Sequence, residues 1–408
     1  MLWWWLVACT PVVETEETDV SEPVPIVDHL TAQQLEAATR RLTDIGARLV
    51  ATPEEQEAAS VIEEWMAEVG IADVVRSPFV WDAWLPGPSQ VRIGDVVYPA
   101  EPFSPSPAAT GIIGPLRLQE PFTDGVALLS SRNGARIEQY LAANSGGAKA
   151  LIRITHDLDH DGGPLLEVGH MVDGATLSAV GVDRPTGDAL RAAAGQQVTV
   201  VVQSNVVRDH TSYNVVARVP GRDPRPVFVT AHYDSWHPSE SAFDNALGVG
   251  MMMVLAQQLA QYPTPEHDVV FLATSGEEQG LKGAFAWVED NAETAGAATL
   301  VINLDVAWSA EGTYVVMASE PERLAQGLAL AESFGITGAI DGGVPGVASD
   351  HFPFSMRGAP TFWAGRWPDR HYHTHRDVAD ELNFDEAERV LRLHWALLVD
   401  AAGVTEGP

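Results

Sequence analysis

The sequence predicts an α/β fold in which helices flank a largely parallel central sheet and a smaller β-rich domain is inserted into the chain. Three observations support this prediction. From Tyr213 onward, apolar runs of strand length alternate with helical patterns, the order expected when crossover helices connect parallel strands. Residues 80–205 instead hold short β-like runs broken by many prolines and glycines. At 408 residues, the chain is long enough for more than one domain.

The first residues resemble a bacterial lipoprotein signal. Residues 1–9 read MLWWWLVAC, and this apolar run is much shorter than the about 20 residues that span a membrane. Leu6-Val7-Ala8-Cys9 resembles a lipobox, so we expect Cys9 to be lipidated. Residues 10–28 contain six acidic residues and no basic one, which predicts a disordered acidic tether. We therefore expect an exported protein of the bacterial cell envelope, facing the periplasm or the exterior and touching the membrane only through its lipid.

Two helices open the main domain, whose first part we assign to residues 29–79. Thr31 to Gln34 form a capping box, and apolar residues follow at helical spacing. Thr52-Pro53-Glu54-Glu55 combines an N-cap, a proline at the first helical position and an early glutamate. The apolar face of this second helix ends before Gly70. Both helices should pack against the sheet through these apolar faces.

The inserted domain contains one clear βαβ pattern. Val126–Leu129 and Ala150–Ile154 are strand-like, and the segment between them is helical through Tyr140. A separate loop at 157–162 reads DLDHDG, with Asp157, Asp159, Asp161 and Gly162 spaced like the start of a calcium-binding loop. The twelfth position holds Val168 instead of glutamate, so the loop departs from the calcium pattern. This domain carries none of the clustered site chemistry found after residue 206.

Residues 206–408 form the second part of the main domain and carry the candidate site. Strands are predicted at Asn214–Val219, Val227–Tyr233, Val269–Thr274 and Thr299–Leu304, with a helix from Asn245 to Leu259. Ligands bind outside the carboxyl ends of strands in such sheets. Histidines and carboxylates gather at those ends: His232, Asp234, Asp244, Glu277, Glu278, Asp305 and His373.

Each of these residues has an ordinary explanation when taken alone. His232 could be a hydrogen-bonded histidine, Asp244 a helix cap, and Glu277 with Glu278 a solvated acidic pair. Together, they place several carboxylates at one edge of the sheet, where they would repel one another unless a cation held them. Imidazole and carboxylate ligands suit zinc, with manganese or cobalt also possible. Their number exceeds the needs of one tetrahedral ion, which favours two bridged ions.

Composition narrows the chemistry further. The 24 lysines and arginines against 56 aspartates and glutamates give a formal net charge of −32, which disfavours nucleic acid as a partner. Cys9 is the single cysteine, so the sequence has no internal disulfide framework, no multi-cysteine metal cluster and no catalytic thiol in the folded part. Cations and free amines are the natural partners of such a surface.

Six motifs occur in the order found in one known family: AHYDS, DNALG, SGEEQGLKGA, NLD, SDHFPF and YHTHRD. Through them, residues 30–400 closely resemble the two-zinc exopeptidase family that contains bacterial leucyl aminopeptidases, glutamate carboxypeptidase, the transferrin receptor ectodomain and glutaminyl cyclase. The resemblance implies the zinc exopeptidase fold, and it implies that residues 80–205 are the protease-associated domain that many members insert.

The resemblance also implies a ligand set. One zinc would be held by His232 and Asp305, a second by Glu278 and His373, and Asp244 would bridge them. The choice of His373 over its neighbours His371 and His375 follows the family pattern alone. In the family, the bridging aspartate precedes a cis peptide bond, which corresponds here to Asp244-Asn245.

Catalytic roles follow from the same resemblance. Glu277 would act as the general base on a water that bridges the metals, and Asp234 would orient His232. Tyr372 matches a tyrosine that donates a hydrogen bond to the oxyanion in some members. His351 is expected to be structural or to face the substrate. Arg366, Arg370 and Arg376 could bind a substrate carboxylate or neutralise the acidic surface.

These observations together predict a zinc-dependent aminopeptidase that removes N-terminal residues from peptides. A carboxypeptidase or dipeptidase with the same metals is the nearest alternative, because His232 to Trp236 resembles the carboxypeptidase branch of the family. Glutaminyl cyclase follows, although such enzymes need only one zinc. A non-catalytic receptor-like scaffold is the remaining alternative, and it would be expected to lack some of the ligands.

Overall fold

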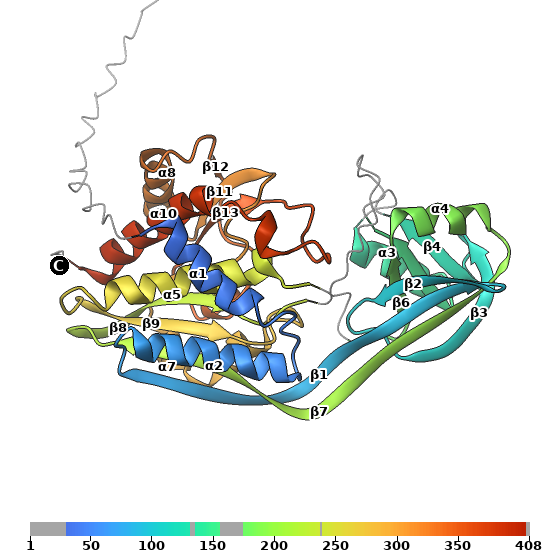
Figure 1. Cartoon of the computed structure of the whole chain (residues 1–408), viewed down its shortest axis with the longest axis horizontal. Helices are drawn as coiled ribbons and strands as arrows, with labels where there is room; N and C mark the ends of the chain where they lie inside the picture. Colours follow the sequence, from blue (N-terminus) through green and yellow to red (C-terminus); the bar gives the residue numbers. More distant parts are fainter. Residues whose placement is uncertain (1–29, 131–134, 156–173, 237–238, 405–408) are drawn as a thin grey trace, which may run out of the picture.

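The computed structural model describes residues 30–130, 135–155, 174–236 and 239–404, which form two lobes joined by two long strands (Figure 1). These strands are β1 (Asp73–Ile93) and β7 (Gln197–Val219). The predicted lipidation site Cys9, the predicted tether at 10–28 and the DLDHDG loop at 157–162 lie outside the described residues. None of the helices in the described ranges is long and apolar enough to cross a membrane.

The larger lobe contains a mixed sheet whose centre is parallel. Its strands run in the order β7-β9-β8-β10-β13-β11-β12, and the four from β9 to β13 are mutually parallel. Strand β7 pairs antiparallel with β9, and β11 pairs antiparallel with β13 but parallel with β12. The bounds are β8 Asp223–His232, β9 His267–Thr274, β10 Leu300–Asn303, β11 Thr313–Ala318, β12 Ile340–Asp341 and β13 Thr361–Trp367. The predicted α/β fold with a large, mostly parallel sheet flanked by helices is confirmed.

Helices cover both faces of this sheet because its central strands are apolar on both sides. In β8, Val227, Val229 and Ala231 face the cluster built with α1, α2, α5, α8 and α10, whereas Phe228 faces α6, α7 and α9. The helices are α1 Ala32–Thr43, α2 Pro53–Glu68, α5 Leu247–Leu259, α6 Lys282–Asp290, α7 Ala292–Gly296, α8 Pro321–Ser333, α9 His351–Ser355 and α10 Phe384–Ala402, with a 3₁₀ turn at Ala379–Glu381.

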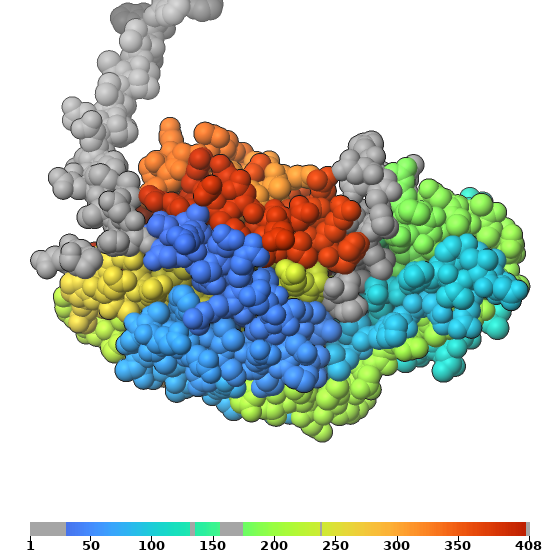
Figure 2. All heavy atoms as spheres, viewed as in Figure 1, coloured from blue at the N-terminus to red at the C-terminus, as the bar shows by residue number. Residues whose placement is uncertain are grey.

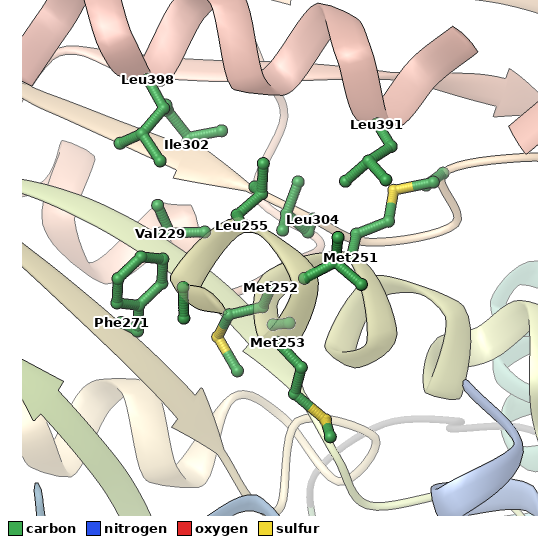
Figure 3. Packing of buried hydrophobic residues seen from close by; sticks show 14 of the residues in the cluster. Val229, Met251, Met252, Met253, Leu255, Phe271, Ile302, Leu304, Leu391 and Leu398 are labelled. Atoms are coloured by element: carbon green, nitrogen blue, oxygen red, sulfur yellow. The ribbon is translucent and has the colours of Figure 1, made fainter. Parts of the chain in front are cut away.

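Helix α5 is the most deeply buried helix of the larger lobe. Its three consecutive methionines, Met251 to Met253, are fully buried, and Figure 3 shows the helix lying between sheet residues such as Phe271 and Leu391 of α10. Burying one such side chain contributes about 1.5–3 kcal/mol. A helix that is almost entirely apolar has little solvent-exposed face, so α5 packs in the layer behind the candidate site.

The two opening helices form as the sequence predicts. Thr31 accepts a hydrogen bond from the backbone of Gln34 and completes a capping box, and Thr52 accepts one from Glu55. Figure 2 shows both helices on one face of the larger lobe, with α1 beside the C-terminal helix. Their caps fix where each helix begins, and their apolar faces then decide how they pack.

The smaller lobe has a sheet that closes on itself. Its strands pair in the order β1-β2-β6-β5-β4-β3-β7, and β7 pairs again with β1. The remaining elements are β2 Val96–Pro102, β3 Ala109–Arg117, β4 Val126–Ser130, α3 Arg136–Ser145, β5 Ala150–Ile154, β6 Ser178–Val182 and α4 Arg184–Ala192. Alternate strand residues fill a core inside this ring and a second core beneath α3. The expected domain boundaries at 79/80 and 205/206 fall inside β1 and β7.

Candidate active site

The candidate site lies where four adjacent parallel strands end. His232 is the last residue of β8, Glu277 and Glu278 follow β9, Asp305 follows β10, and His373 lies beyond the end of β13. Since parallel strands present their carboxyl ends at one edge, residues separated by 141 positions in the chain meet there. These are the residues that the sequence predicts at this edge of the sheet.

The first group of potential ligands contains His232, Asp244 and Asp305. The Nε2 atom of His232 lies 2.9 Å from Oδ1 of Asp244 and 3.4 Å from Oδ1 of Asp305. All three side chains are buried or nearly so. One imidazole nitrogen and two carboxylate oxygens therefore converge on a single point.

The second group contains Asp244, Glu278 and His373. The Nε2 atom of His373 lies 3.0 Å from Oδ2 of Asp244 and 3.1 Å from Oε2 of Glu278. Asp244 thus directs one oxygen to each group. This carboxylate joins the two groups into one continuous centre.

The local backbone explains how Asp244 becomes available. The segment Ala242–Ala246 forms a single irregular turn before α5, and the Asp244-Asn245 peptide bond is cis. The helix begins at Leu247, two residues later than the predicted start, because the Asn245 side chain accepts the hydrogen bond from Gly248. Asn245 therefore takes the capping role considered for Asp244, whose carboxylate stays directed at the histidines. Asp377 accepts hydrogen bonds from the backbone of Phe243 and Asp244 at 2.6 and 3.1 Å.

Asp234 lies behind the first group and connects it to the acidic loop after β9. Its Oδ1 atom is 3.6 Å from Nδ1 of His232, on the opposite side of the ring from Asp244. Its two oxygens accept hydrogen bonds from the backbone of Glu277 and Glu278 at 3.2 and 3.3 Å. The backbone carbonyl of Asp234 lies 3.2 Å from the same Nδ1, so this one residue fixes a histidine ring and the position of both glutamates.

The charge balance of the two groups favours a bound cation. Oδ1 of Asp305 and Oε1 of Glu278 are buried and have no hydrogen-bond partner among the described residues. Burial, with the nearby charge of Asp244, raises the pKa of Glu278 to about 7. Burial also opposes ionisation of Asp244, but hydrogen bonds from His232 and His373 outweigh it and lower the pKa of this carboxyl. Buried oxygens without donors are costly unless a cation is bound, so these residues fit two divalent ions.

Glu277 lies beside both groups and belongs to neither. Burial raises its pKa well above the ordinary value, and the nearby Asp305 adds to the effect. The side chain lines a cavity of about 330 Å³ that opens next to the two groups. A carboxylate with a raised pKa at the edge of a cavity is suited to accept a proton and return it.

The cavity has a mostly apolar lining with a few carboxylates. Its apolar lining includes Val306, Val315, Met317, Trp363 and Trp367, and its acidic lining is formed by Asp244, Glu277 and Asp305. Tyr372 and His351 also line it. Burial raises the pKa of Tyr372 well above 10, so its hydroxyl remains a hydrogen-bond donor at neutral pH. The side chain of His351 is held through Nε2, which lies 2.9 Å from the carbonyl of Gly346.

The arginines proposed for substrate binding lie elsewhere. Arg366 donates to the carbonyl of Gly312 and stacks over Tyr314, and Arg370 pairs with Glu311 at 3.2 Å. Arg370 and Arg376 line a separate hollow beside Phe243. None of the three lines the cavity next to the potential metal ligands.

Three residues that support the site are not among those predicted from the sequence. Ser349 and Asp377 lie inside the motifs SDHFPF and YHTHRD, so a signal for both was present. Arg48 had none: its buried guanidinium donates to five backbone carbonyls, including those of Tyr233, Glu240 and Ser241. Burial lowers the pKa of Arg48 to about 10. The residue fixes both ends of the connection between His232 and Asp244.

Comparisons with known proteins agree with this geometry. The family model described as Peptidase family M28 matches residues 214–398. The chain is 27% identical over 263 residues to aminopeptidase YwaD of Bacillus subtilis, which corresponds to 61% of this chain and 55% of that protein. The chain therefore spans about half the length of this curated relative.

Solved structures extend the likeness to both lobes. The zinc aminopeptidase BSAP from Bacillus subtilis superposes with a TM-score of 0.77 at 22% identity, covering 92% of this chain and 96% of that one. A peptidase M28 precursor from Shewanella amazonensis gives the same TM-score at 19% identity and the same coverage. At these identities, the two structures establish a shared fold.

Proposed function

We propose that this chain, whose residues 214–398 match peptidase family M28, is a two-metal aminopeptidase. The observation that carries the proposal is the pair of ligand groups sharing Asp244 in the acidic lining of a mostly apolar cavity. The similarity to YwaD and to BSAP, which are described as an aminopeptidase and a zinc aminopeptidase, supports it. We also propose that the smaller lobe is the protease-associated domain that the sequence predicts.

Two divalent ions, with zinc as the first candidate, would be held by His232 and Asp305 and by Glu278 and His373, with Asp244 between them. Bound ions of this kind supply Lewis acidity for peptide hydrolysis. Zinc accepts this mixture of imidazole and carboxylate ligands. Manganese and cobalt are the alternatives to zinc at such a site. Asp234 orients His232 through its Nδ1 side, the usual arrangement behind a metal-binding histidine.

The remaining chemistry belongs to two side chains of the cavity. Glu277 accepts a proton from the attacking water and delivers it to the departing amine, which its raised pKa allows. The Tyr372 hydroxyl donates a hydrogen bond to the oxygen that gains negative charge as the peptide carbonyl is attacked. The Tyr372 ring is held for this task because it stacks on His373, at 3.7 Å between centroids, and contacts Trp367 edge-on.

The charge of the cavity favours an aminopeptidase over a carboxypeptidase. Its acidic lining suits the free amine of a peptide N-terminus, with Glu277 and Asp305 as the nearest carboxylates. A substrate carboxylate would need a cation, and Arg366 and Arg370 are engaged outside the cavity. The apolar walls of the cavity suit a large apolar side chain on the residue that is removed.

The proposal is tested with the full-length chain purified without chelator. We expect about two zinc ions per chain by mass spectrometry, together with cleavage of leucyl anilide. N-acetyl-leucyl anilide should resist cleavage because its amine is blocked. Cleavage of free dipeptides alone would move the protein to the dipeptidase or carboxypeptidase branch. Absence of both metal and turnover would support a non-catalytic scaffold and overturn the proposal.

We further propose that the protein is exported to the bacterial cell envelope and anchored by a lipid on Cys9. This proposal follows from the lipobox-like segment and the acidic residues after it. Labelling of cells with a fatty-acid probe should mark the wild-type chain and leave Cys9→Ser unmarked. Equal labelling of both chains would contradict it.

A further inference from the structure

Four aromatic rings connect the smaller lobe to the second ligand group. Trp84 stacks on Trp236 with ring centroids 6.1 Å apart and planes inclined by 15°. Trp236 stacks on His373 at 5.8 Å, and His373 stacks on Tyr372 at 3.7 Å, each with planes inclined by 21°. Trp84 belongs to β1, the strand that runs from the larger lobe into the smaller one (Figure 1). A residue of this connecting strand thus reaches a potential metal ligand through one intervening ring.

A second connection runs from Trp84 to Glu278. The side chain of Gln279, the residue after Glu278, accepts a hydrogen bond from the backbone nitrogen of Trp84 at 3.0 Å. The same side chain donates to the backbone carbonyl of Trp84 at 2.7 Å. This two-point contact is buried, so it fixes the backbone that carries Glu278 relative to β1.

Trp84 is itself held by the smaller lobe. Its indole nitrogen donates to the carbonyl of Ser106 at 3.2 Å, and the Ser106 hydroxyl donates to the carbonyl of Ala179 in β6 at 2.7 Å. Trp84 and Trp236 are both about 4% exposed and form a small apolar cluster of their own. The position of the Trp84 ring therefore depends on the sheet of the smaller lobe.

His373 needs such support more than the other ligands. Its backbone has a φ of 56°, in the left-handed region that costs a non-glycine residue about 1–2 kcal/mol. The first group is fixed by other means, because Asp234 lies against His232 and Ser349 donates to Asp305. The contacts of Trp84 thus lead to two members of the second group, His373 and Glu278.

We propose that Trp84 is a positioning residue through which the smaller lobe sets the metal affinity of the second group, Asp244, Glu278 and His373. The proposal rests on the two-metal function proposed above. Loss of the Trp84 ring removes the support behind Trp236 and loosens His373. The first metal position, at His232 and Asp305, keeps its own supports. The two positions therefore respond unequally to a change at Trp84.

The experiment titrates the metal-free full-length protein with Co²⁺, following the visible absorption bands, and with Zn²⁺ in competition with a chelator. The variants are Trp84→Ala, Trp84→Phe and Gln279→Met, which removes the two-point contact without adding charge. Trp395→Phe serves as the control, because Trp395 on α10 is an equally buried tryptophan that contacts Tyr262. Thermal unfolding of each metal-free variant reports general damage separately.

We expect one of the two binding steps to weaken about 10-fold or more in Trp84→Ala, the range typical of residues behind metal ligands, while the other step stays as in wild type. Trp84→Phe should restore part of the loss, Gln279→Met should weaken the same step, and Trp395→Phe should alter neither. Equal weakening of both steps, or no weakening, would overturn this proposal while leaving the two-metal function intact. A wild-type chain that binds fewer than two ions would overturn both.

Discussion

Ser349 donates a hydrogen bond of 2.5 Å from its hydroxyl to Oδ2 of Asp305. The same hydroxyl accepts one from the Asn303 side chain at 2.7 Å, and Asn303 accepts one from Thr230 at 2.8 Å. The Ser349 proton is therefore committed to Asp305, whose other oxygen is left facing His232. A short chain of buried groups on β8 and β10 fixes the orientation of one potential ligand.

Replacing Ser349 by alanine should weaken metal binding at His232 and Asp305. The Asp305 carboxylate would lose the bond that fixes Oδ2, so we expect about a 10-fold to 100-fold loss of affinity. Competition with a chelator measures the change. Ser333→Ala is the matched control, because the Ser333 hydroxyl is exposed and bonds only within its own helix. An unchanged affinity in Ser349→Ala would show that the Asp305 orientation is set elsewhere.

Glu277→Gln should separate metal binding from catalysis. Glu277 lies outside both ligand groups, so the variant should retain two ions, whereas kcat should fall about 100-fold to 10,000-fold because glutamine cannot accept the proton. Metal content and anilide hydrolysis are measured on the same preparation. Glu289→Gln, an exposed glutamate of α6, should behave as wild type. Full activity in Glu277→Gln would remove the residue from the mechanism.

Met317→Asp should change which N-terminal residue is preferred. Met317 lies on the apolar wall of the cavity, where a carboxylate would be desolvated by an apolar substrate but paired by a basic one. We expect kcat/KM for leucyl anilide to fall about 100-fold. The ratio of kcat/KM for leucyl anilide to kcat/KM for lysyl anilide should fall as well. Val344→Asp adds the same charge at a side chain that is 67% exposed and outside the lining. Equal losses in both variants would contradict the assignment of the wall.

The stability of the metal-free protein should depend on His394 at acidic pH. Burial lowers the pKa of this histidine to about 4, because its Nδ1 is 2.9 Å from the carbonyl of Val390 and its Nε2 is buried without a partner in the described structure. The unfolded chain binds a proton near pH 6.5 and the folded one only near 4, so the free energy of unfolding falls as pH drops between these values. The loss amounts to about 3 kcal/mol.

The variant His394→Asn tests this dependence. Asparagine can keep a donor near Val390 but does not titrate, so the slope of unfolding free energy against pH should flatten between pH 6.5 and 4. Urea unfolding with chelator present, at several pH values, gives both slopes. Any cavity left by the smaller side chain shifts the whole curve and does not alter its slope. Identical slopes in the two proteins would remove His394 as the cause.

Local signals explain why much of the fold could be predicted. The helix caps at Thr31 and Thr52 can be recognised from four consecutive residues. The apolar strands of the central sheet can be recognised from their length and from the polar residues that flank them. The gathering of ligands at strand ends follows from parallel pairing. The helix after Asp244 was predicted two residues early, because the sequence does not reveal that Asn245 performs the capping.

The supports around the site could not be predicted in the same way. Arg48 acts on backbone carbonyls about 190 residues away in the chain, and carbonyls carry no sequence signal. The stack of Trp84 on Trp236 joins two lobes, so it depends on how those lobes meet. The arginines near the YHTHRD motif were close in sequence, but β13 and the turn after it direct them away from the cavity.

Strands β1 and β7 pair antiparallel along their passage from one lobe to the other, from Asp73 opposite Arg218 to Arg92 opposite Thr199, with register shifts after Trp81 and after Gly87. An exchange of the smaller lobe between relatives would therefore place both junctions within paired strands and not within loops. A junction shifted by one residue would exchange the inward and outward faces of every side chain beyond it. A chimaera must preserve the register of both strands. The exchanged lobe would also place its own residue at position 84, next to the site.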